Sequence, residues 1–272
     1  MPRSQKMKQR KLQAPSFVVL IFIILFLVVA RVESESKYAI PISARYPINE
    51  KPFEAIHEKT VQIPTKEVAL VLCDVWDLNY MHPAYKNIIP VLDLFRKHKS
   101  TIIHAASVAE KYPDFYNPLK SEMRNLKEPL TSIANIPLMH WPTYRASKIK
   151  NEVDSFYNKE VQSKQRPLMP DISRLTRPVK GEYVINTYEE LRFIAYKHGI
   201  TTFIYVGGAV DYCMLTKPYG ILNLKSQFVR SNFVVIVLDD CVFGQEDPEP
   251  YLRMYSRTGL ALLSNSKRIQ AK

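Results

Sequence analysis

The chain alternates between short runs of apolar residues and segments whose apolar residues recur at helical spacing. The apolar runs predict strands, and runs that are apolar throughout are typical of strands buried on both faces of a parallel sheet. These runs are residues 68–73, 101–105, 183–185, 202–206, 233–238 and, as a possible edge strand, 261–263. The alternation predicts an α/β fold with a doubly wound, mainly parallel sheet of five to six strands flanked by helices.

Four segments between these runs have helical periodicity. The first begins with Pro83, which suits the first turn of a helix, and places Ile88, Leu92 and Phe95 on one face. The helix that follows the run at 202–206 is expected to break or restart near Pro218, because proline removes a helical hydrogen bond. The predicted helices are residues 83–98, 188–198, 213–224 and 249–258.

Three polar or reactive residues follow predicted strands. Asp74 comes directly after the first run, Cys213 comes after the turn that ends the run at 202–206, and Asp239 comes after the run at 233–238. The carboxyl ends of parallel strands share one rim of a sheet, and ligands bind there in folds of this class. A carboxylate and a cysteine that meet at this rim can serve as base and nucleophile toward a carbonyl group, so we expect Asp74 and Cys213 to be catalytic.

The turn before Cys213 contains Gly207 and Gly208 side by side in a chain with only seven glycines, which predicts a sharp bend or a close backbone approach. A cysteine that begins a helix lies near unpaired N–H groups and the positive end of the helix dipole, which favour the thiolate. The alternative is an ordinary turn with a buried, inert cysteine. The three cysteines, which include Cys73 and Cys241, are too few for a disulfide framework.

The N-terminus has the pattern of a targeting segment. Five basic residues at 3–11 precede fourteen consecutive apolar residues at 17–30. A bilayer span needs about 20 residues, and small residues follow near residue 34, so a cleaved signal peptide is favoured over an uncleaved signal anchor. In either case the domain, residues 35–272, is expected to be lumenal, secreted or anchored on the non-cytosolic side, with membrane contact only through residues 1–34.

Charge and composition exclude some partners. The net charge of +12 falls to +7 without residues 1–34, which hold six of the Lys and Arg and one of the acidic residues. The remaining basic residues are spread along the chain and lack the interleaved aromatics of a nucleic-acid module, so no nucleic-acid partner is expected. The six histidines show no metal-ligand spacing, so we expect neither a metal nor another cofactor. A small-molecule substrate is the expected ligand.

The segment at 107–178 breaks the alternation with prolines, aromatic residues and charges. It is too long for a simple loop of a compact domain and is expected to be a functional insert or lid over the rim. Near the rim, Trp76, His104 and Tyr212 are candidates to line the substrate pocket, although packing or a structural hydrogen bond is the favoured role for His104. Asp77 is expected to cap a helix or a turn.

Two stretches, residues 69–77 and 204–213, resemble the isochorismatase-like cysteine hydrolases, and the resemblance extends over residues 60–265. The first stretch resembles the family's first strand with its catalytic aspartate, and the second resembles the strand, turn and nucleophile. The resemblance implies a three-layer α/β/α fold, a cis peptide bond between Gly208 and Ala209, an oxyanion hole made by the backbone N–H groups of Ala209 and Cys213, and a homo-oligomer. The motifs are closer to a poorly characterised branch than to nicotinamidases.

The chain departs from the family's pattern at its third catalytic residue. The family has a lysine after the third strand, whereas this chain reads Val184-Ile185-Asn186-Thr187. Lys180 and Lys217 are the nearest other lysines in the pattern, and a surface position is expected for both. The metal ligands of nicotinamidases are not recognisable either.

Two functional hypotheses follow. In the first, Asp74 deprotonates Cys213, and the thiolate attacks an amide or a related C–N bond of a small molecule. In the second, the missing lysine marks a catalytically degenerate relative that acts as a binding or scaffold protein. A third and weaker one is a membrane-tethered structural protein with an incidental cysteine. The retention of both Asp74 and Cys213 favours the first.

Overall fold

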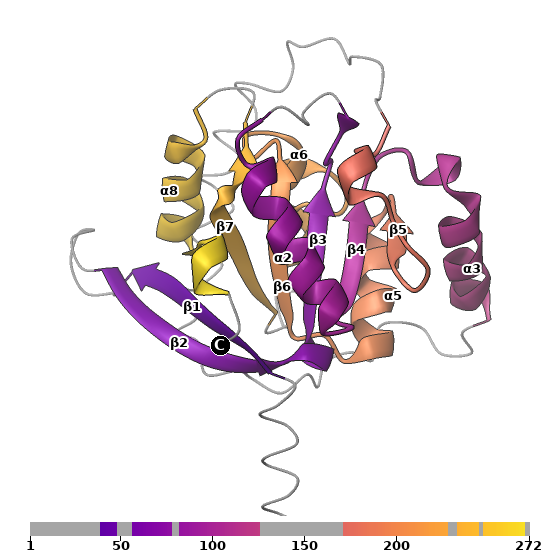
Figure 1. Ribbon diagram of the computed structural model, residues 1–272, viewed down its shortest axis with the longest axis horizontal. Coiled ribbons are helices and arrows are strands. Elements are labelled where there is room, and N and C mark those ends of the chain that lie inside the picture. Colours follow the sequence, from indigo (N-terminus) through magenta and orange to yellow (C-terminus); the bar gives the residue numbers. More distant parts are fainter. Residues whose placement is uncertain are drawn as a thin grey trace, which may run out of the picture. The chain divides into compact units, whose positions relative to one another are not determined.

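An eight-stranded sheet forms the centre of the fold, with the strand order β2-β1-β8-β7-β6-β3-β4-β5 (Figure 1). The computed structural model describes residues 39–47, 56–77, 82–125, 171–227, 233–244 and 247–269. Six of the strands pair in parallel and stand in the order that two oppositely wound halves produce. The parallel strands are β3 (Val68–Cys73), β4 (Thr101–Ala105), β5 (Tyr183–Ile185), β6 (Thr202–Gly208), β7 (Val234–Phe243) and β8 (Leu262–Ser264). The predicted α/β class and the six parallel strands are confirmed.

Two strands at the N-terminal side of the sheet were not predicted. The strands β1 (Ala39–Pro47) and β2 (Ile56–Pro64) pair antiparallel, and β1 also pairs with β8. Ile40, Ile42 and Ala44 are fully buried at every second position, which is the burial pattern of a strand with one covered face. The expectation that 261–263 forms an edge strand is therefore wrong, because β1 lies beside β8.

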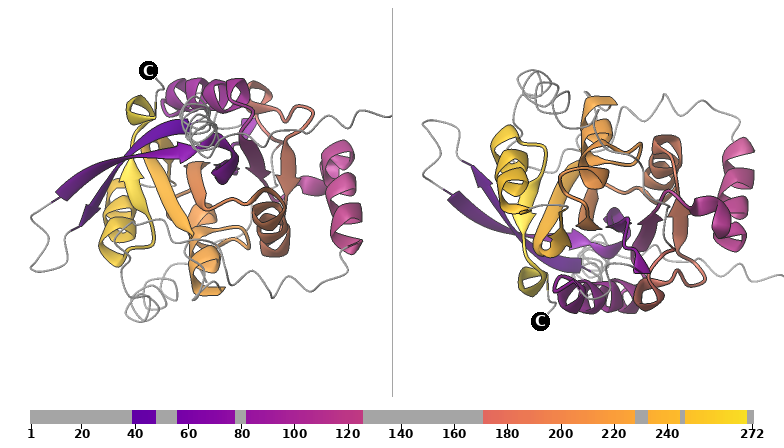
Figure 2. Two further views of the ribbon diagram at one scale, coloured as in Figure 1. Left: turned by 90° about the horizontal axis from the view of Figure 1, so that it is seen from below. Right: turned by 90° about the horizontal axis from the view of Figure 1, so that it is seen from above.

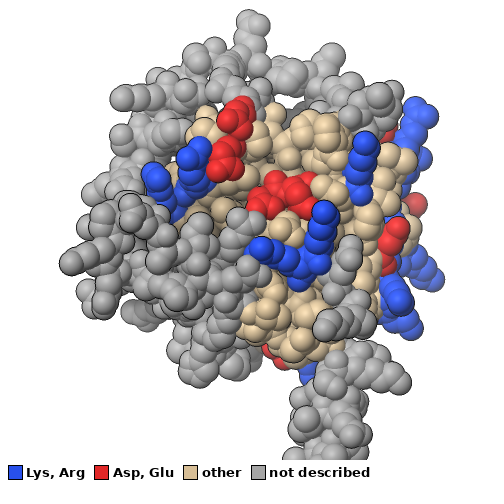
Figure 3. Space-filling model, turned by 60° about the vertical axis from the view of Figure 1, so that its left-hand side comes forward, with Lys and Arg blue, Asp and Glu red and all other residues tan. Residues whose placement is uncertain are grey.

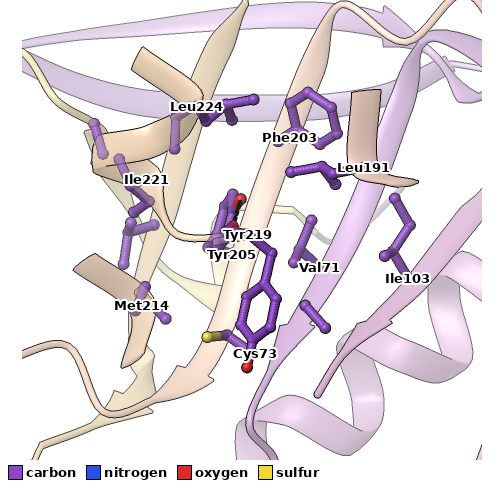
Figure 4. Packing of buried hydrophobic residues seen from close by; sticks show 14 of the residues in the cluster. Val71, Cys73, Ile103, Leu191, Phe203, Tyr205, Met214, Tyr219, Ile221 and Leu224 are labelled. Carbon is purple, nitrogen blue, oxygen red and sulfur yellow. Dashed lines mark hydrogen bonds between the residues drawn. The ribbon is translucent and has the colours of Figure 1, made fainter. Parts of the chain in front are cut away.

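Helices cover both faces of the parallel sheet (Figure 2). On one face lies α2 (Tyr85–Lys97), whose buried residues pack into one apolar cluster with β1 and alternate residues of the central strands. On the other face lie α5 (Tyr188–His198), α7 (Ile221–Gln227) and α8 (Glu249–Thr258). Figure 4 shows this second cluster, in which Val71, Phe203 and Leu224 pack between strands and helices. Alternate residues of the strands thus belong to the two clusters on opposite faces of the sheet, as expected for strands that are buried on both faces.

The chain after Cys213 forms two short helices instead of one. The first, α6 (Cys213–Thr216), is a single turn, and α7 begins three residues beyond Pro218. This is the predicted break. Strand β7 runs further than predicted, because its register against β6 shifts between Tyr205 and Gly207 and the strand continues to Phe243. Asp239 therefore lies within β7 and not at its end.

Part of the expected insert is described. Residues 113–124 form α3 (Pro113–Arg124), and the chain returns at Asp171, where Ile172 bridges to Trp76. The remainder of the segment expected as a lid, 126–170, lies outside the described residues, and so does the targeting segment at 1–34. Among the helices that are described, none is long and apolar enough to cross a membrane.

Candidate active site at the carboxyl rim of the sheet

Asp74 is the first residue beyond β3 and is fully buried. Its backbone φ is 43°, in the left-handed region that aspartate enters more readily than most residues. Its N–H donates to the carbonyl of Ala105, which continues the pairing of β3 and β4 for one more residue. The strand end therefore fixes the backbone of Asp74, and the left-handed turn sets the direction of its side chain.

The turn that presents Cys213 depends on two close backbone approaches. Gly207 has φ of +97°, and a Cβ there would lie 2.3 Å from the Cys73 carbonyl oxygen. A Cβ on Gly208 would lie 2.3 Å from the Phe243 ring. The glycine pair therefore permits a close approach, as the sequence predicted. The peptide bond between Gly208 and Ala209 is cis.

Cys213 begins α6, and its thiol is only partly exposed. The Ala209 carbonyl accepts hydrogen bonds from the N–H groups of Tyr212 and Met214, which closes the turn around the cysteine. The thiol reaches the Asp74 carboxylate and also interacts with the backbone of Ala209. The predicted nucleophile and the predicted base are thus in the same place.

The Cys213 thiol is held in its protonated form. Burial, and after it the charge and hydrogen bond of Asp74, raise the pKa of Cys213 to about 12, against the lowering effects of Lys217 and the Ala209 backbone. This differs from the expectation that the start of a helix favours the thiolate. The reason is that α6 is a single turn with a weak dipole, whereas burial and a carboxylate in contact act directly on the thiol.

Lys217 is the residue that sequence reasoning placed wrongly. It was expected on the surface, but its side chain is only 14% exposed, and its Nζ lies 2.9 Å from Asp74 Oδ2. The same Nζ donates to Ser107 Oγ at 2.5 Å and lies 5.9 Å from the centre of the Trp76 ring. The signal that could have found it is the following proline, because a residue before proline is driven out of the helical conformation.

Tyr219 and Ser107 complete the surroundings of the Asp74 carboxylate. The Tyr219 hydroxyl donates to Asp74 Oδ1 at 2.9 Å and lies 3.0 Å from Ser107 Oγ. Tyr219 is fully buried, and burial raises the pKa of its phenol well above the usual value, so the hydroxyl keeps its proton. Asp74 Oδ2 is buried and accepts no well-aligned hydrogen bond from the described residues, although it faces the Lys217 ammonium.

The three pocket candidates have different environments. Trp76 is 9% exposed, belongs to one apolar cluster with Ala106 and Ile172, and lies beside Lys217. Tyr212 is half-buried directly before Cys213 and stays a candidate. His104 does not belong to the site.

The ring of His104 is buried and its Nε2 lies 2.8 Å from Glu182 Oε2. Arg96 of α2 also binds Glu182, which places this network on the α2 side of the sheet. Burial lowers the pKa of His104 against the opposing effect of Glu182. The hydrogen bond that the sequence favoured for His104 is therefore made with Glu182, and none of the described contacts of His104 is with Asp74, Cys213 or Lys217. Asp77 acts as a turn cap, as predicted, because its Oδ1 accepts from the N–H of Arg174 at 2.7 Å.

Thr187, at the position where the resembling family carries a lysine, caps a helix in this chain. Thr187 is the N-cap of α5, its hydroxyl accepts from the Glu190 N–H, and the Glu190 carboxylate accepts from the N–H groups of Asn186 and Thr187. This is a capping box, and it commits Thr187 to the start of the helix. Asp239 was expected at the rim but lies within β7. The next residue, Asp240, accepts hydrogen bonds from the N–H and the hydroxyl of Ser266, one on each carboxylate oxygen.

The charged side chains of the described surface bear on the ligand classes that the sequence excluded. On the face shown in Figure 3, the described Lys and Arg side chains lie in small groups, with acidic and uncharged residues between the groups. Within the described ranges, no three His, Cys, Asp or Glu side chains gather as a set that could hold a metal ion.

The fold and this site define a three-layer α/β protein with a buried aspartate, a partly exposed cysteine and a partly exposed lysine at the carboxyl rim of its sheet. No model of a known protein family matches the chain, and no curated protein matches it. Among solved structures, the chain is similar to an isochorismatase from Pseudomonas putida, with 12% identity and a TM-score of 0.41 over 76% of this chain and 91% of that one. It is also similar to an isochorismatase-like hydrolase from Alkaliphilus metalliredigens, with 13% identity and a TM-score of 0.41 over 74% of this chain and 96% of that one. At this identity the likeness extends to the fold class alone, which the strand order establishes independently.

Proposed function

We propose that the domain is an isochorismatase-like cysteine hydrolase that cleaves an amide or a related C–N bond of a small molecule. The observation that carries the proposal is the contact between the Cys213 thiol and the buried Asp74 carboxylate at the carboxyl ends of two neighbouring strands. A thiol beside a base, next to backbone N–H groups, is the arrangement that acyl transfer needs.

The first half of the reaction forms an acyl-enzyme. Asp74 takes the proton from Cys213 as the sulfur attacks the carbonyl carbon, and the carbonyl π pair moves to the oxygen. The N–H groups of Ala209 and Cys213 bind this oxyanion. When the carbonyl re-forms, the C–N bond breaks and the proton on Asp74 passes to the leaving nitrogen. Trp76 and Tyr212 would line the pocket in which the substrate lies.

The second half releases the acid. Asp74 removes a proton from water, the resulting hydroxide attacks the thioester, and the C–S bond breaks. The sulfur recovers the proton from Asp74, so the enzyme returns to a neutral thiol beside a carboxylate. The resting state is thus a thiol, and attack and proton transfer are coupled, which agrees with a Cys213 pKa of about 12.

The experiment is a screen of small primary and secondary amides with the purified full-length chain, compared with Cys213→Ala. Turnover by the wild type that Cys213→Ala abolishes, with a mass increase of one acyl group on the peptide containing Cys213, is the expected result. Cys241→Ala is the matched control, since this thiol is buried beside Asp240 and away from Asp74. Equal turnover by Cys213→Ala would exclude the proposal.

The second candidate is a catalytically degenerate protein that binds a ligand or a partner. The absence of a lysine at Thr187 and the strongly protonated thiol of Cys213 favour it. It predicts that no amide is turned over although ligands still raise the melting temperature.

We also propose export into the secretory pathway and assembly as a homo-oligomer, on the sequence pattern and the family resemblance alone. Expression in a secreting cell followed by N-terminal sequencing tests the first. A mature chain that begins near Glu35 supports a signal peptide, whereas an intact N-terminus in the membrane fraction supports an anchor. Light scattering of the purified chain gives the oligomeric state.

A further inference from the structure

Four polar side chains form a closed ring at the rim. Lys217 Nζ donates to Ser107 Oγ, Ser107 lies 3.0 Å from the Tyr219 hydroxyl, Tyr219 donates to Asp74 Oδ1, and Asp74 Oδ2 faces Lys217 at 2.9 Å. The Tyr219 hydroxyl donates its proton to Asp74, so the Ser107 hydroxyl must donate to Tyr219 and accept from Lys217. Every hydroxyl in the ring then has one fixed direction.

The local sequence explains why Lys217 points into the site. Pro218 drives the preceding residue out of the helical region, and Lys217 is extended, with φ of −61° and ψ of 161°. Its N–H still donates to the Cys213 carbonyl, and its own carbonyl accepts from Asn223 Nδ2 at 2.8 Å. The backbone of Lys217 is therefore held on both sides, one turn beyond the nucleophile.

The charges in this space are balanced by one cation. Asp74 is the carboxylate, and the neighbouring Cys73, Cys213 and Tyr219 all have raised pKa values and are neutral at pH 7. The nearby carboxylate and thiols raise the pKa of Lys217 although its burial lowers it, so Lys217 is protonated. A buried carboxylate without this ammonium would bear the full cost of desolvation.

We propose that Lys217 is the catalytic cation of this site, delivered from the segment after the nucleophile and positioned by Ser107 and Tyr219, in place of the lysine that is absent at Thr187. The proposal rests on the proposed hydrolase function. Lys217 pairs with the Asp74 carboxylate, whose Oδ2 accepts the Cys213 proton, and it offsets the negative charge that passes to the substrate oxygen when the S–C bond forms. Lys217 loses no proton itself, and the Asp74 proton leaves with the nitrogen.

Two observations separate this arrangement from an incidental surface ion pair. Lys217 is held by two partners at 2.5 and 2.9 Å and is 14% exposed, whereas Lys180, the other lysine near the strand in sequence, is exposed. The ion pair also leaves Asp74 Oδ2 without a well-aligned hydrogen bond, so this oxygen keeps a lone pair for a proton. A purely structural carboxylate is normally fully hydrogen-bonded.

The test compares Lys217→Met with Lys180→Met in the full-length chain, using the rate of Cys213 alkylation by iodoacetamide from pH 7 to 11. Lys217 lowers the pKa of Cys213, so Lys217→Met should slow alkylation by about tenfold at pH 9, while Lys180→Met should match the wild type. Lys217→Arg should keep most of the wild-type rate. Unchanged alkylation in folded Lys217→Met would overturn the proposal.

A second pair of variants keeps the test valid if Lys217→Met does not fold. Ser107→Ala and Tyr219→Phe retain every charge but remove the ring's directing hydroxyls, and each should reduce alkylation about two- to fivefold, with Ser107→Thr restoring it. Wild-type rates in both would overturn the positioning role. A structural role alone would lower stability without moving the pH profile.

Alkylation needs no substrate, so the two proposals fail separately. If the wild type cleaves no amide and Lys217→Met still slows alkylation, the hydrolase proposal fails while the role of Lys217 on the thiol stands. If the wild type cleaves an amide and Lys217→Met keeps kcat within twofold with an unchanged alkylation profile, the hydrolase proposal stands and Lys217 is not its catalytic cation. A fall in kcat of about 100-fold or more is expected.

Discussion

Asp74 and Glu182 are both buried carboxylates with cationic neighbours, but their hydrogen bonding differs. Glu182 accepts from Arg96 Nε and Nη2, from His104 Nε2 and from the Val179 N–H, so both of its oxygens are hydrogen-bonded. Asp74 accepts one well-aligned hydrogen bond, from Tyr219, and its second oxygen faces the Lys217 ammonium.

The difference in hydrogen bonding indicates which of the two carboxylates could accept a proton. Burial raises the pKa of Glu182, but the hydrogen bonds from His104 and Arg96 outweigh it and lower the pKa to about 2. Such a group takes no proton near neutral pH and serves to join α2 to β4 and the segment before β5. Asp74 Oδ2 accepts no well-aligned hydrogen bond from the described residues, which suits the general base of the proposed reaction.

Exchanging each carboxylate for its amide should give the largest contrast. Asp74→Asn removes the proton acceptor and should lower kcat/KM for a cleaved amide by about 10²- to 10⁴-fold. Glu182→Gln should stay within about threefold of the wild type, and the exposed Asp93→Asn serves as a control. A loss of activity in Glu182→Gln as large as that in Asp74→Asn would remove the distinction between the two groups.

The reactivity of Cys213 should change in the opposite direction to turnover. The Asp74 charge and hydrogen bond both raise the pKa of Cys213, so Asp74→Asn lowers it and should speed iodoacetamide alkylation at pH 8 by about tenfold or more. Peptide mass spectrometry measures the rate, with Cys241 as the internal comparison. Slower alkylation in a folded Asp74→Asn protein would mean that Asp74 does not contact the thiol.

Glu182 should make the free energy of unfolding depend on pH in the acid range. Because its pKa is lowered in the folded state, it contributes stability above the unfolded value of 4.5, and this contribution is lost as the pH falls through about 2. Wild type should exceed Glu182→Gln by about 2 kcal/mol at pH 6, after discounting for partial solvent screening, and the difference should shrink toward pH 2. Urea unfolding at several pH values measures it. A difference that does not change with pH would show that Glu182 is not the titrating group.

His104 adds a second, smaller acid dependence. Its pKa is lowered by burial, so the neutral ring stabilises the fold above pH 6.5, and this stability is lost as the pH falls below that value. His104→Gln should remove this part of the pH dependence without changing amide turnover. Parallel unfolding curves for the variant and the wild type between pH 7 and 5 would contradict it.

The smallest effect is expected at the position of the missing lysine. Thr187→Ala removes the cap of α5 and should lower the free energy of unfolding by about 1 kcal/mol with no change in Cys213 alkylation. Thr187→Ser retains the cap and is the control. If Thr187→Ala altered the alkylation profile, the turn before α5 would belong to the site after all.

The sequence by itself determined the parallel strands, most of the helices and the placement of two catalytic candidates. Continuous apolar runs predicted β3 and β6, and the topology of parallel strands brought the residues that follow them, Asp74 and the Cys213 turn, to one rim. These predictions depend on local periodicity and on a general rule of chain connection, so a single sequence is enough. The close backbone approach at Gly207 and Gly208 was also predictable, because only glycine allows backbones to approach so closely.

The tertiary structure alone decided the surroundings of Lys217 and Cys213 and the place of β1 in the sheet. Whether a lysine lies on the surface or against a carboxylate depends on residues far along the chain, here Ser107 and Asp74, which no local pattern joins. The pKa of Cys213 likewise follows from burial and from a carboxylate 139 positions away in sequence, which outweigh the local effect of one helical turn. Local sequence sets backbone conformation, whereas charge balance and burial are sums over neighbours that only the folded chain brings together.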